Sequence, residues 1–395
     1  MQTQNAPENP IRIFLVAGEA SGDVLAAELI EPLRAQFGDN AVFAGVGGPA
    51  LAARGVPSSI DMSQLSVLGF FEGLMAWRRV SRLAKETAKQ AAAFKADIVV
   101  LVDSWGFTMR VAHAVRALRP EALLVKYVGP QVWATRPGRV KNLAAAVDHL
   151  LSIHAFEAPY YVQTDLPVTF VGNPVLSRKA RGDRAALRQR YNIADDTKVL
   201  LVLFGSRRAE FTRLHDAFVQ AVEDVRARHP DLMVFCPLSG AIAIQVQAAA
   251  SEDRRLQDMI FLDEADNADA FATADLALAC SGTVTTELAA AGVPMVVGYK
   301  IGGLTWFLLK TFFLKTRYAS LVNIAVDEMI VPEFIQEACT ETALSAALDA
   351  LLSDPDTYAQ QKYGLGRAIA NLQSGGPSTA HRAAEVIHHA FKKRA

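Results

Sequence analysis

One segment, residues 272–299, limits what this chain can fold into more than any other. Its apolar run Leu276–Cys280 has the length and the residue types of a buried strand. Small residues at 281–283 interrupt the run, and 284–291 has the composition of a helix that ends at a glycine and a proline. Met295–Tyr299 has the composition of a second strand. A strand, a tight turn, a helix and a strand predict half of a doubly wound α/β fold.

The turn of this unit is the first candidate binding site. At a helix start the backbone N–H groups of Ser281, Gly282 and Thr283 are available to a ligand, and the helix dipole favours an anion, so the turn suits a phosphate. Glu287 lies about one turn into the helix, where its carboxylate can bind the sugar hydroxyls of a nucleotide. An ordinary turn between a strand and a helix is the alternative.

Length and composition set the class of protein. A chain of 395 residues predicts two domains, and its 51% hydrophobic and 21% charged content describes a folded protein. The net charge of −1 argues against broad nucleic-acid binding, and three distant cysteines predict neither a disulfide framework nor a zinc site. The polar N-terminus does not resemble a signal peptide, and no apolar run reaches the roughly 18–20 residues of a membrane span. We therefore expect a cytoplasmic protein.

The first half of the chain repeats the pattern of strands that end in polar turns. The strand Ile11–Ala17 opens onto a small-residue turn that contains Glu19 and Ser21, and such a turn lies at the carboxyl edge of a parallel sheet. A β-branched run at 97–102 brings Asp103 to the same kind of edge. A carboxylate there is a candidate general base, and the alternative is that it caps the helix expected at 108–118.

The second half of the chain begins near Asn173, where we place the domain boundary. Its first strand, at 199–204, ends in Gly205, Ser206 and Arg207. Small residues followed by an arginine suit a diphosphate or its departing charge, because a guanidinium group binds phosphate in a fork.

Basic residues gather in three further places. Arg136, Arg139 and Lys141 form a cationic cluster that faces either phosphate or water. The segments 65–83 and 301–317 combine aromatic, apolar and basic residues, which is the profile of a segment at an anionic lipid surface. A half-buried domain helix with solvated arginines is the alternative for the first of these segments.

Eight segments, taken in order, resemble those of the lipid-A-disaccharide synthase family of glycosyltransferases. The resemblance runs from about Ile11 to Cys339, and eight segments in one order are more specific than any one of them. The segments are VAGEASGD (16–23), GVGGP (45–49), LVDSWGF (101–107), YVGPQVWA (127–134), FVGNP (170–174), FGSRRAE (204–210), CSGTVTTE (280–287) and SLVNIAVDEMIVPEFIQEACT (320–340).

The resemblance implies an α/β chain of two Rossmann-like domains that face each other across a cleft, the GT-B glycosyltransferase architecture. Residues 1–172 would form the acceptor-binding domain and 173–365 the UDP-sugar-binding domain. Residues 366–395 would form C-terminal helices that pack across the domains, with the last helix returning to the N-terminal domain.

The implied reaction is an inverting glycosyl transfer. A 2,3-diacylglucosamine unit moves from UDP-2,3-diacylglucosamine to the 6-hydroxyl of 2,3-diacylglucosamine 1-phosphate, which gives the β-1,6-linked lipid A disaccharide 1-phosphate and UDP. Inversion requires one base and no covalent intermediate, so a single carboxylate suffices.

The resemblance also assigns roles to residues of this chain. Asp103 is then the base, Arg207 and the N–H groups at 281–283 stabilise the leaving diphosphate, and Glu287 holds the ribose. The residues expected in the acceptor cleft are Glu19, Ser21 and Asn323. No metal or other cofactor is implied, because the DxD pattern at 354–356 is expected in a surface turn.

The partners expected from the resemblance are the two lipid substrates and the lipids of the inner-membrane surface, without nucleic acid. The enzyme would be cytoplasmic and peripherally associated with the inner membrane, and an oligomer stays an open alternative.

Three departures from the family pattern affect the expected acceptor fit and acyl-chain preference. The residues 104–106 (SWG) stand where the family usually has a second Asp in an APD-like turn, and Phe204 and Val322 stand where proline is common. Two other functions remain open. One is a UDP-N-acetylglucosamine-type 2-epimerase of the same architecture, and the other is a divergent paralogue that binds glycolipid or UDP without turnover.

Overall fold

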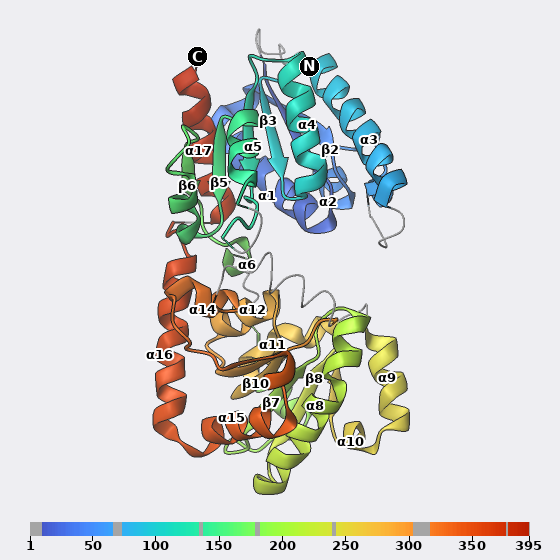
Figure 1. The fold of residues 1–395 in the computed structure, drawn as a ribbon, viewed down its shortest axis with the longest axis vertical. Coiled ribbons are helices and arrows are strands. Elements are labelled where there is room, and N and C mark those ends of the chain that lie inside the picture. The colour runs from blue at the N-terminus through green and yellow to red at the C-terminus, as the bar shows by residue number, and fades with distance from the viewer. Residues whose placement is uncertain are drawn as a thin grey trace, which may run out of the picture. The chain divides into compact units, whose positions relative to one another are not determined.

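The computed structural model of the chain contains two compact α/β units (Figure 1). Unit 1 consists of Met1–Pro174 and Ser374–Ala395, and unit 2 of Val175–Gln373. The structure describes residues 10–65, 73–133, 137–177, 182–238, 242–302, 317–376 and 378–394, without the side chains of 39, 63, 64 and 73–76. The division beside Asn173 lies where the sequence placed it. The C-terminal region predicted at 366–395 is split, however, because its residues up to 373 belong to unit 2.

Unit 1 is built on a sheet of six parallel strands in the order β2-β1-β3-β4-β5-β6. The order reverses between β1 and β3, so the carboxyl ends of these two strands flank a topological switch point, where open α/β sheets bind ligands. The strands are β1 Ile11–Ala17, β2 Ala41–Val46, β3 Ile98–Val102, β4 Leu123–Tyr127, β5 His149–Ser152 and β6 Val168–Phe170.

Helices cover both faces of this sheet (Figure 1). Val99 of β3 belongs to the hydrophobic core shared with α3, α4 and α5, whereas its neighbour Val100 belongs to the core shared with α1 and α17. The C-terminal helix α17 therefore returns to the unit that contains the N-terminal strand, and the Phe37 ring at the end of α1 meets its Phe391 ring edge-on. The helices of unit 1 are α1 Ala20–Phe37, α2 Pro49–Ala53, α3 Gly73–Ala93, α4 Trp105–Leu118, α5 Arg139–Ala146 and α17 Thr379–Arg394, with 3-10 turns η1 Gly38–Asn40, η2 Met62–Leu65 and η3 Ala155–Tyr161.

Unit 2 has a second parallel sheet of six strands, in the order β12-β11-β10-β7-β8-β9. This order reverses between β7 and β10, which is the doubly wound arrangement that the segment 272–299 predicted. The strands are β7 Val199–Leu203, β8 Met233–Pro237, β9 Ile260–Leu262, β10 Leu276–Cys280, β11 Met295–Tyr299 and β12 Glu333–Ile335.

Successive residues of β10 also enter two different cores. Leu278 packs with residues of α8, α9 and α15, and Ala279 packs with residues of α12, α14 and α16. The helices of this part of the chain are α6 Pro174–Ser177, α7 Arg184–Arg190, α8 Arg208–Arg228, α9 Ala243–Glu252, α10 Arg254–Gln257, α11 Asn267–Thr273, α12 Thr283–Ala291, α14 Leu321–Val326, α15 Glu341–Ser353 and α16 Pro355–Leu372, with η4 Glu264–Asp266 and η5 Gln336–Ala338.

The predicted central strands are confirmed, since β3, β7 and β10 are buried along their whole length. Two helices begin earlier than the sequence suggested. The first helix begins at Ala20, within the small-residue turn expected after Ile11–Ala17, and the helix expected at 108 begins at Trp105. In both cases residues expected in the turn form the first turn of the helix. The polar side chains Ser21 and Ser104 therefore lie close to the ends of β1 and β3.

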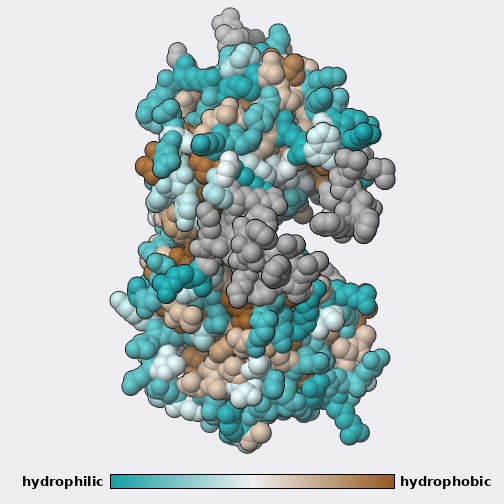
Figure 2. All heavy atoms as spheres, in the orientation of Figure 1, coloured by the Kyte–Doolittle hydropathy of each residue, from teal (hydrophilic) through white to brown (hydrophobic). Residues whose placement is uncertain are grey.

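Within the described ranges, no helix combines the length and the hydropathy that a membrane span requires. Figure 2 shows hydrophilic side chains over most of the face drawn for each unit. The apolar residues of the sheets lie in the interior, on both sides of each sheet.

Candidate active site

The switch point of unit 2 opens onto a cavity of about 400 Å³. Because β7 and β10 pair in parallel, with Leu203 opposite Ala279, their carboxyl ends lie level and their following turns meet. All the residues that the sequence assigned to the donor diphosphate and ribose line this cavity. They are Gly205, Ser206, Arg207, Ser281, Gly282, Thr283 and Glu287.

The turn after β7 is held by Glu210, to which the sequence analysis gave no role. The Glu210 side chain accepts hydrogen bonds from the backbone N–H groups of Ser206 (3.0 Å) and Arg207 (3.2 Å), and its other oxygen lies 2.9 Å from Arg207 Nη1. Gly205 has a φ of +98°, and a Cβ at this position would lie 2.4 Å from Glu210 Oε2, so glycine is required there. A glutamate three residues after the N-cap is a capping-box signal that could have identified this contact.

The Arg207 side chain stays 78% exposed although Glu210 holds one edge of it. A guanidinium group presents five N–H donors in a fixed plane, so a held arginine can still bind a phosphate through its remaining donors.

The other side of this cavity is the start of α12. Its N-cap is the exposed Gly282, and the first N–H groups of an α-helix have no acceptor within the helix, so they suit an anion. The Ser281 hydroxyl donates to the Ala319 carbonyl oxygen at 3.3 Å, which fixes the turn. Glu287 is half-buried, and burial raises the pKa of its carboxyl group. Hydrogen bonds from ligand hydroxyls would offset the cost of desolvating this carboxylate.

In unit 1, Asp103 follows β3 at the switch point and lies in a strained turn. Asp103 and Ser104 have φ angles of +49° and +40°, a region that non-glycine residues adopt at a cost of about 1–2 kcal/mol each. The Asp103 carbonyl oxygen accepts hydrogen bonds from Thr108 Oγ1 (2.8 Å) and Lys126 Nζ (2.6 Å). Ser104 is the N-cap of α4 and no side-chain cap hydrogen bond is present, so the alternative that Asp103 caps this helix is wrong.

Lys126 is a buried cation beneath this turn, and the sequence analysis missed it. Its Nζ also contacts the carbonyl oxygens of Leu101 (3.3 Å) and Tyr127 (3.4 Å). Burial lowers the pKa of Lys126 from 10.5 to about 7, against the attraction of Asp103 and Glu19, which raises it. The only sequence signal was a lysine inside an apolar strand, and such a residue is rarely fully buried without partners.

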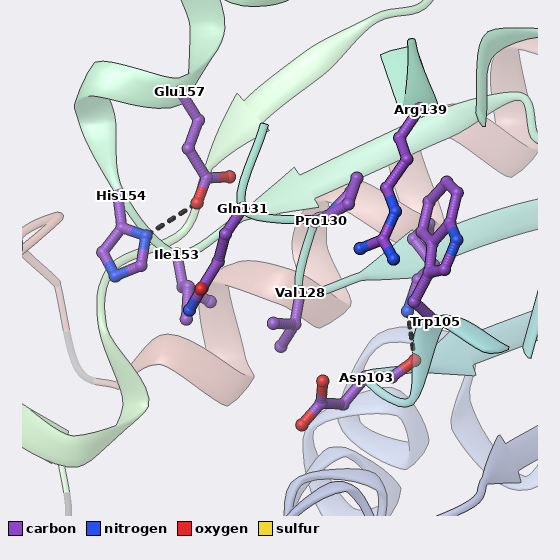
Figure 3. A pocket seen from close by; sticks show the side chains of 11 residues that line it. Asp103, Trp105, Val128, Pro130, Gln131, Arg139, Ile153, His154 and Glu157 are labelled. Carbon is purple, nitrogen blue, oxygen red and sulfur yellow. Dashed lines mark hydrogen bonds and ion pairs between the residues drawn. The ribbon is translucent and has the colours of Figure 1, made fainter. Parts of the chain in front are cut away.

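The Asp103 side chain lines a cavity of about 210 Å³ at the carboxyl edge of the unit 1 sheet (Figure 3). Ser21 Oγ donates to Asp103 Oδ2 at 3.3 Å, and Glu19 is the exposed N-cap of α1. A Cβ at Gly18 would lie 2.7 Å from Ser104 Oγ, so the two turns are in close contact. The turn that contains Glu19 and Ser21 therefore lies beside the candidate base.

Asn323 does not lie in an open cleft, and this prediction was wrong. The residue is fully buried, and its Oδ1 accepts hydrogen bonds from the N–H groups of Ile330 (3.0 Å) and Val331 (2.9 Å). Its Nδ2 donates to the Val331 carbonyl oxygen (2.8 Å) and to Glu333 Oε1 (2.7 Å). Because all four hydrogen-bonding positions of the amide are used, Asn323 holds the segment before β12 in place.

The DxD residues form a helix start instead of the expected surface turn. The Asp354 side chain accepts a hydrogen bond from the Asp356 N–H group at 3.0 Å and caps α16. Among the described residues, no group of three or more His, Cys, Asp or Glu side chains is placed to hold a metal ion. Arg136, residues 66–72 of the first aromatic and basic segment, and residues 303–316 of the second lie outside the described residues.

Comparison with solved structures identifies the architecture. A putative UDP-N-acetylglucosamine 2-epimerase from Listeria monocytogenes superposes with a TM-score of 0.66 over 97% of both chains, at 15% identity. Two parallel doubly wound units with cavities at their switch points give this chain the fold shared by GT-B type glycosyltransferases and related epimerases. At this level of identity the likeness concerns the fold alone.

Sequence relatives identify the family. The family model described as Lipid-A-disaccharide synthetase matches residues 13–387. The chain is 40% identical to the lipid-A-disaccharide synthase of Rhodospirillum centenum over 98% of this chain and 96% of the relative. It is 38% identical to the enzyme of the same name from Paramagnetospirillum magneticum over 95% and 96%. The chain belongs to the lipid-A-disaccharide synthase family, and it is a hexosyltransferase.

Proposed function

We propose that this enzyme transfers the 2,3-diacylglucosamine unit of UDP-2,3-diacylglucosamine to the 6-hydroxyl of 2,3-diacylglucosamine 1-phosphate. The acceptor oxygen forms a bond to the anomeric carbon while the bond from that carbon to the UDP oxygen breaks, and its electron pair leaves with UDP. The hydroxyl proton passes to Asp103, and the anomeric configuration is inverted. The products are the β-1,6-linked disaccharide 1-phosphate and UDP.

The observation that carries this proposal is the convergence of the donor residues on one cavity of unit 2. Arg207 and the start of α12 supply the donors for a departing diphosphate, and Glu287 supplies an acceptor for the ribose. In unit 1, Asp103 supports the role of base because its carbonyl oxygen is held by two hydrogen bonds while its carboxylate lines a separate cavity.

We also propose that the enzyme works at the cytoplasmic face of the inner membrane. The described start of α3 supports this location, because Trp77 is 54% exposed and Arg78 and Arg82 beside it are exposed. An exposed aromatic ring next to arginines suits a surface of anionic lipid, which is where both diacylated substrates would reside.

Incubating the purified protein with both lipids tests the reaction. UDP should be released only when 2,3-diacylglucosamine 1-phosphate is present, and mass spectrometry should find the disaccharide 1-phosphate. Asp103→Asn should lower turnover by roughly 10²–10⁴-fold because general base catalysis contributes that factor. The matched control is Asp165→Asn, an exposed carboxylate in unit 1, which should keep full activity. Full turnover of Asp103→Asn would remove the base assignment.

An epimerase function is tested in the same preparation. Conversion of UDP-N-acetylglucosamine to its 2-epimer without any lipid acceptor would contradict the proposed transfer. UDP binding without transfer to any diacylglucosamine phosphate would instead favour a paralogue that does not turn over.

A further inference from the structure

The unit 1 cavity has two chemically different walls besides Asp103 (Figure 3). One wall is made by Arg139, the first residue of α5, and by Trp105 of α4. The other wall is made by His154 and Glu157, which follow β5. A cavity with distinct walls can orient a ligand as well as bind it.

The Arg139 wall suits an anion. Its guanidinium carbon lies 5.0 Å from the centre of the Trp105 ring, and Figure 3 shows its nitrogen atoms turned toward the side of the cavity where Asp103 lies. A guanidinium stacked on a ring keeps its N–H groups in one plane, which matches the oxygens of a phosphate. The start of α5 adds the favourable end of a helix dipole.

The neighbouring cations do not offer the same site. Lys126 Nζ is engaged by the carbonyl oxygens of its own sheet and is fully buried. Lys141 is exposed and does not line the cavity. Of the two described members of the cationic cluster, Arg139 and Lys141, Arg139 is therefore the one that lines the cavity.

The opposite wall suits a neutral hydrogen-bond donor. Glu157 is 1% exposed, and its Oε1 lies 2.6 Å from His154 Nδ1. Within the described part of the chain its buried Oε2 has no hydrogen-bond partner, although the residue lines the cavity. An unpaired buried carboxylate oxygen gains free energy from a hydroxyl or amide N–H and would repel a phosphate. The His154 ring stacks on Phe156 with the planes 8° apart, so its position is fixed.

We infer that this cavity is the site of the acceptor head group, with the 1-phosphate on Arg139 and a neutral hydroxyl or amide of the sugar at the His154–Glu157 pair. This inference rests on the proposed function, because it takes a phosphorylated amino sugar as the acceptor. The two walls then fix which way round the sugar lies, so that one hydroxyl is directed to Asp103. Trp105, which belongs to the segment where this chain departs from the family pattern, supports the phosphate-binding arginine.

Paired acceptors test the phosphate contact. The rate of transfer is measured with 2,3-diacylglucosamine 1-phosphate and with the same lipid without its phosphate. The preference for the phosphate is the ratio of the two kcat/KM values. We expect the wild type to prefer the phosphorylated acceptor by roughly 10- to 100-fold, the range for a hydrogen bond to a charged group. Arg139→Gln should abolish most of this preference, because it should slow transfer to the phosphorylated acceptor far more than transfer to the acceptor that lacks phosphate. Arg139→Lys should keep part of it, and the exposed control Lys141→Gln should keep all of it.

A substitution in the His154–Glu157 wall should affect the two acceptors differently from one at Arg139. Glu157→Gln should slow transfer to both acceptors by the same factor, because the contact at this wall does not involve the phosphate. The inference is wrong if the wild type shows no preference, if Arg139→Gln retains it, or if Arg139→Gln slows both acceptors equally. A change of preference in Glu157→Gln would overturn the division between the walls.

Binding without turnover separates this inference from the proposed reaction. Glucosamine 1-phosphate can be titrated into the full chain with saturating UDP, so that the unit 2 cavity is occupied, and followed by phosphorus NMR. Line broadening in the wild type that is lost in Arg139→Gln supports the phosphate site, even if no disaccharide forms. Transfer activity combined with equal broadening in both proteins would overturn the site while leaving the proposed function in place.

Discussion

Replacing Lys126 by Met should stabilise unit 1 and slow the enzyme at the same time. Lys126 is 1% exposed, and burial lowers its pKa from 10.5 to about 7. In the unfolded chain the amine is protonated at pH 7, whereas in the folded protein it is close to half protonated. The unfolded state therefore binds more protons between pH 7 and 10.5, and the free energy of unfolding must rise with pH across that window.

The magnitude follows from the pKa difference. At about 1.4 kcal/mol per pKa unit, a buried lysine with a pKa of about 7 destabilises the fold by about 4 kcal/mol at pH 7 and by about 2 kcal/mol at pH 9. Met carries no charge and avoids this destabilisation, but it loses amine hydrogen bonds worth about 1 kcal/mol. The Asp103 carbonyl oxygen keeps Thr108 Oγ1 at 2.8 Å, and the Tyr127 carbonyl oxygen keeps the Asp103 N–H at 2.9 Å. We expect Lys126→Met to be about 3 kcal/mol more stable at pH 7, with the gain falling by about 2 kcal/mol by pH 9.

Urea unfolding followed by tryptophan fluorescence measures this difference. Three of the four tryptophans, Trp77, Trp105 and Trp133, belong to unit 1, so the signal reports mainly on that unit. The exposed Lys141→Met serves as the control and should match the wild type at both pH values. The reasoning is refuted if Lys126→Met is less stable than the wild type at pH 7, or if their difference does not change between pH 7 and 9.

The same variant should lose activity. The left-handed turn at Asp103 and Ser104 would then be held by Thr108 without the lysine, so the carboxylate would be less well positioned. We expect kcat to fall by about tenfold with little change in KM for either substrate, since a positional error in a catalytic group acts mainly on the chemical step. An unchanged kcat would show that the lysine does not position the base.

Three further predictions concern unit 2 and the membrane. Glu210→Ala should weaken UDP binding by about tenfold in calorimetry because the N–H groups of Ser206 and Arg207 lose their acceptor, and Glu210→Gln should restore part of it. Asn323→Ala should lower the unfolding free energy of unit 2 by about 2–4 kcal/mol without raising the KM for the acceptor; a raised KM in a fully stable variant would return Asn323 to the site. The protein should float with anionic liposomes at low salt, less so after Trp77→Ala, and failure of the wild type to float would contradict the membrane proposal.

The unit 2 cavity was predictable because parallel strand pairing brings together turns that are far apart in the sequence. Gly205 and Ser281 are distant in the chain, but each follows a buried strand, and small residues after such strands mark the carboxyl edge. Only the pairing of β7 with β10 was needed to bring the two turns together. The same reasoning placed Asp103 at the edge of the unit 1 sheet.

The residues that support the site could not be found in this way. Lys126 Nζ donates to the backbone carbonyl oxygen of Asp103, and Glu157 Oε1 lies beside the imidazole of His154. The hydrophobic periodicity of a sequence does not predict such individual contacts. Asn323 was misplaced because a polar residue in a family segment suggests a ligand contact, whereas four local hydrogen bonds use its whole amide. Sequence reasoning therefore located the edges of the two sheets but not the contacts that stabilise them.

The unit 1 cavity is where the proposed transferase and an epimerase of the same fold should differ. Both kinds of enzyme require a site for a nucleotide diphosphate, so the residues around Arg207 and Gly282 cannot distinguish transfer from epimerisation. A transferase must in addition bind a second sugar and remove a proton from its hydroxyl. Asp103 is a carboxylate beside a cavity whose walls, Arg139 and Glu157, suit a phosphate and a hydroxyl. Variants in this cavity should therefore separate acceptor use from UDP binding, which variants in unit 2 cannot do.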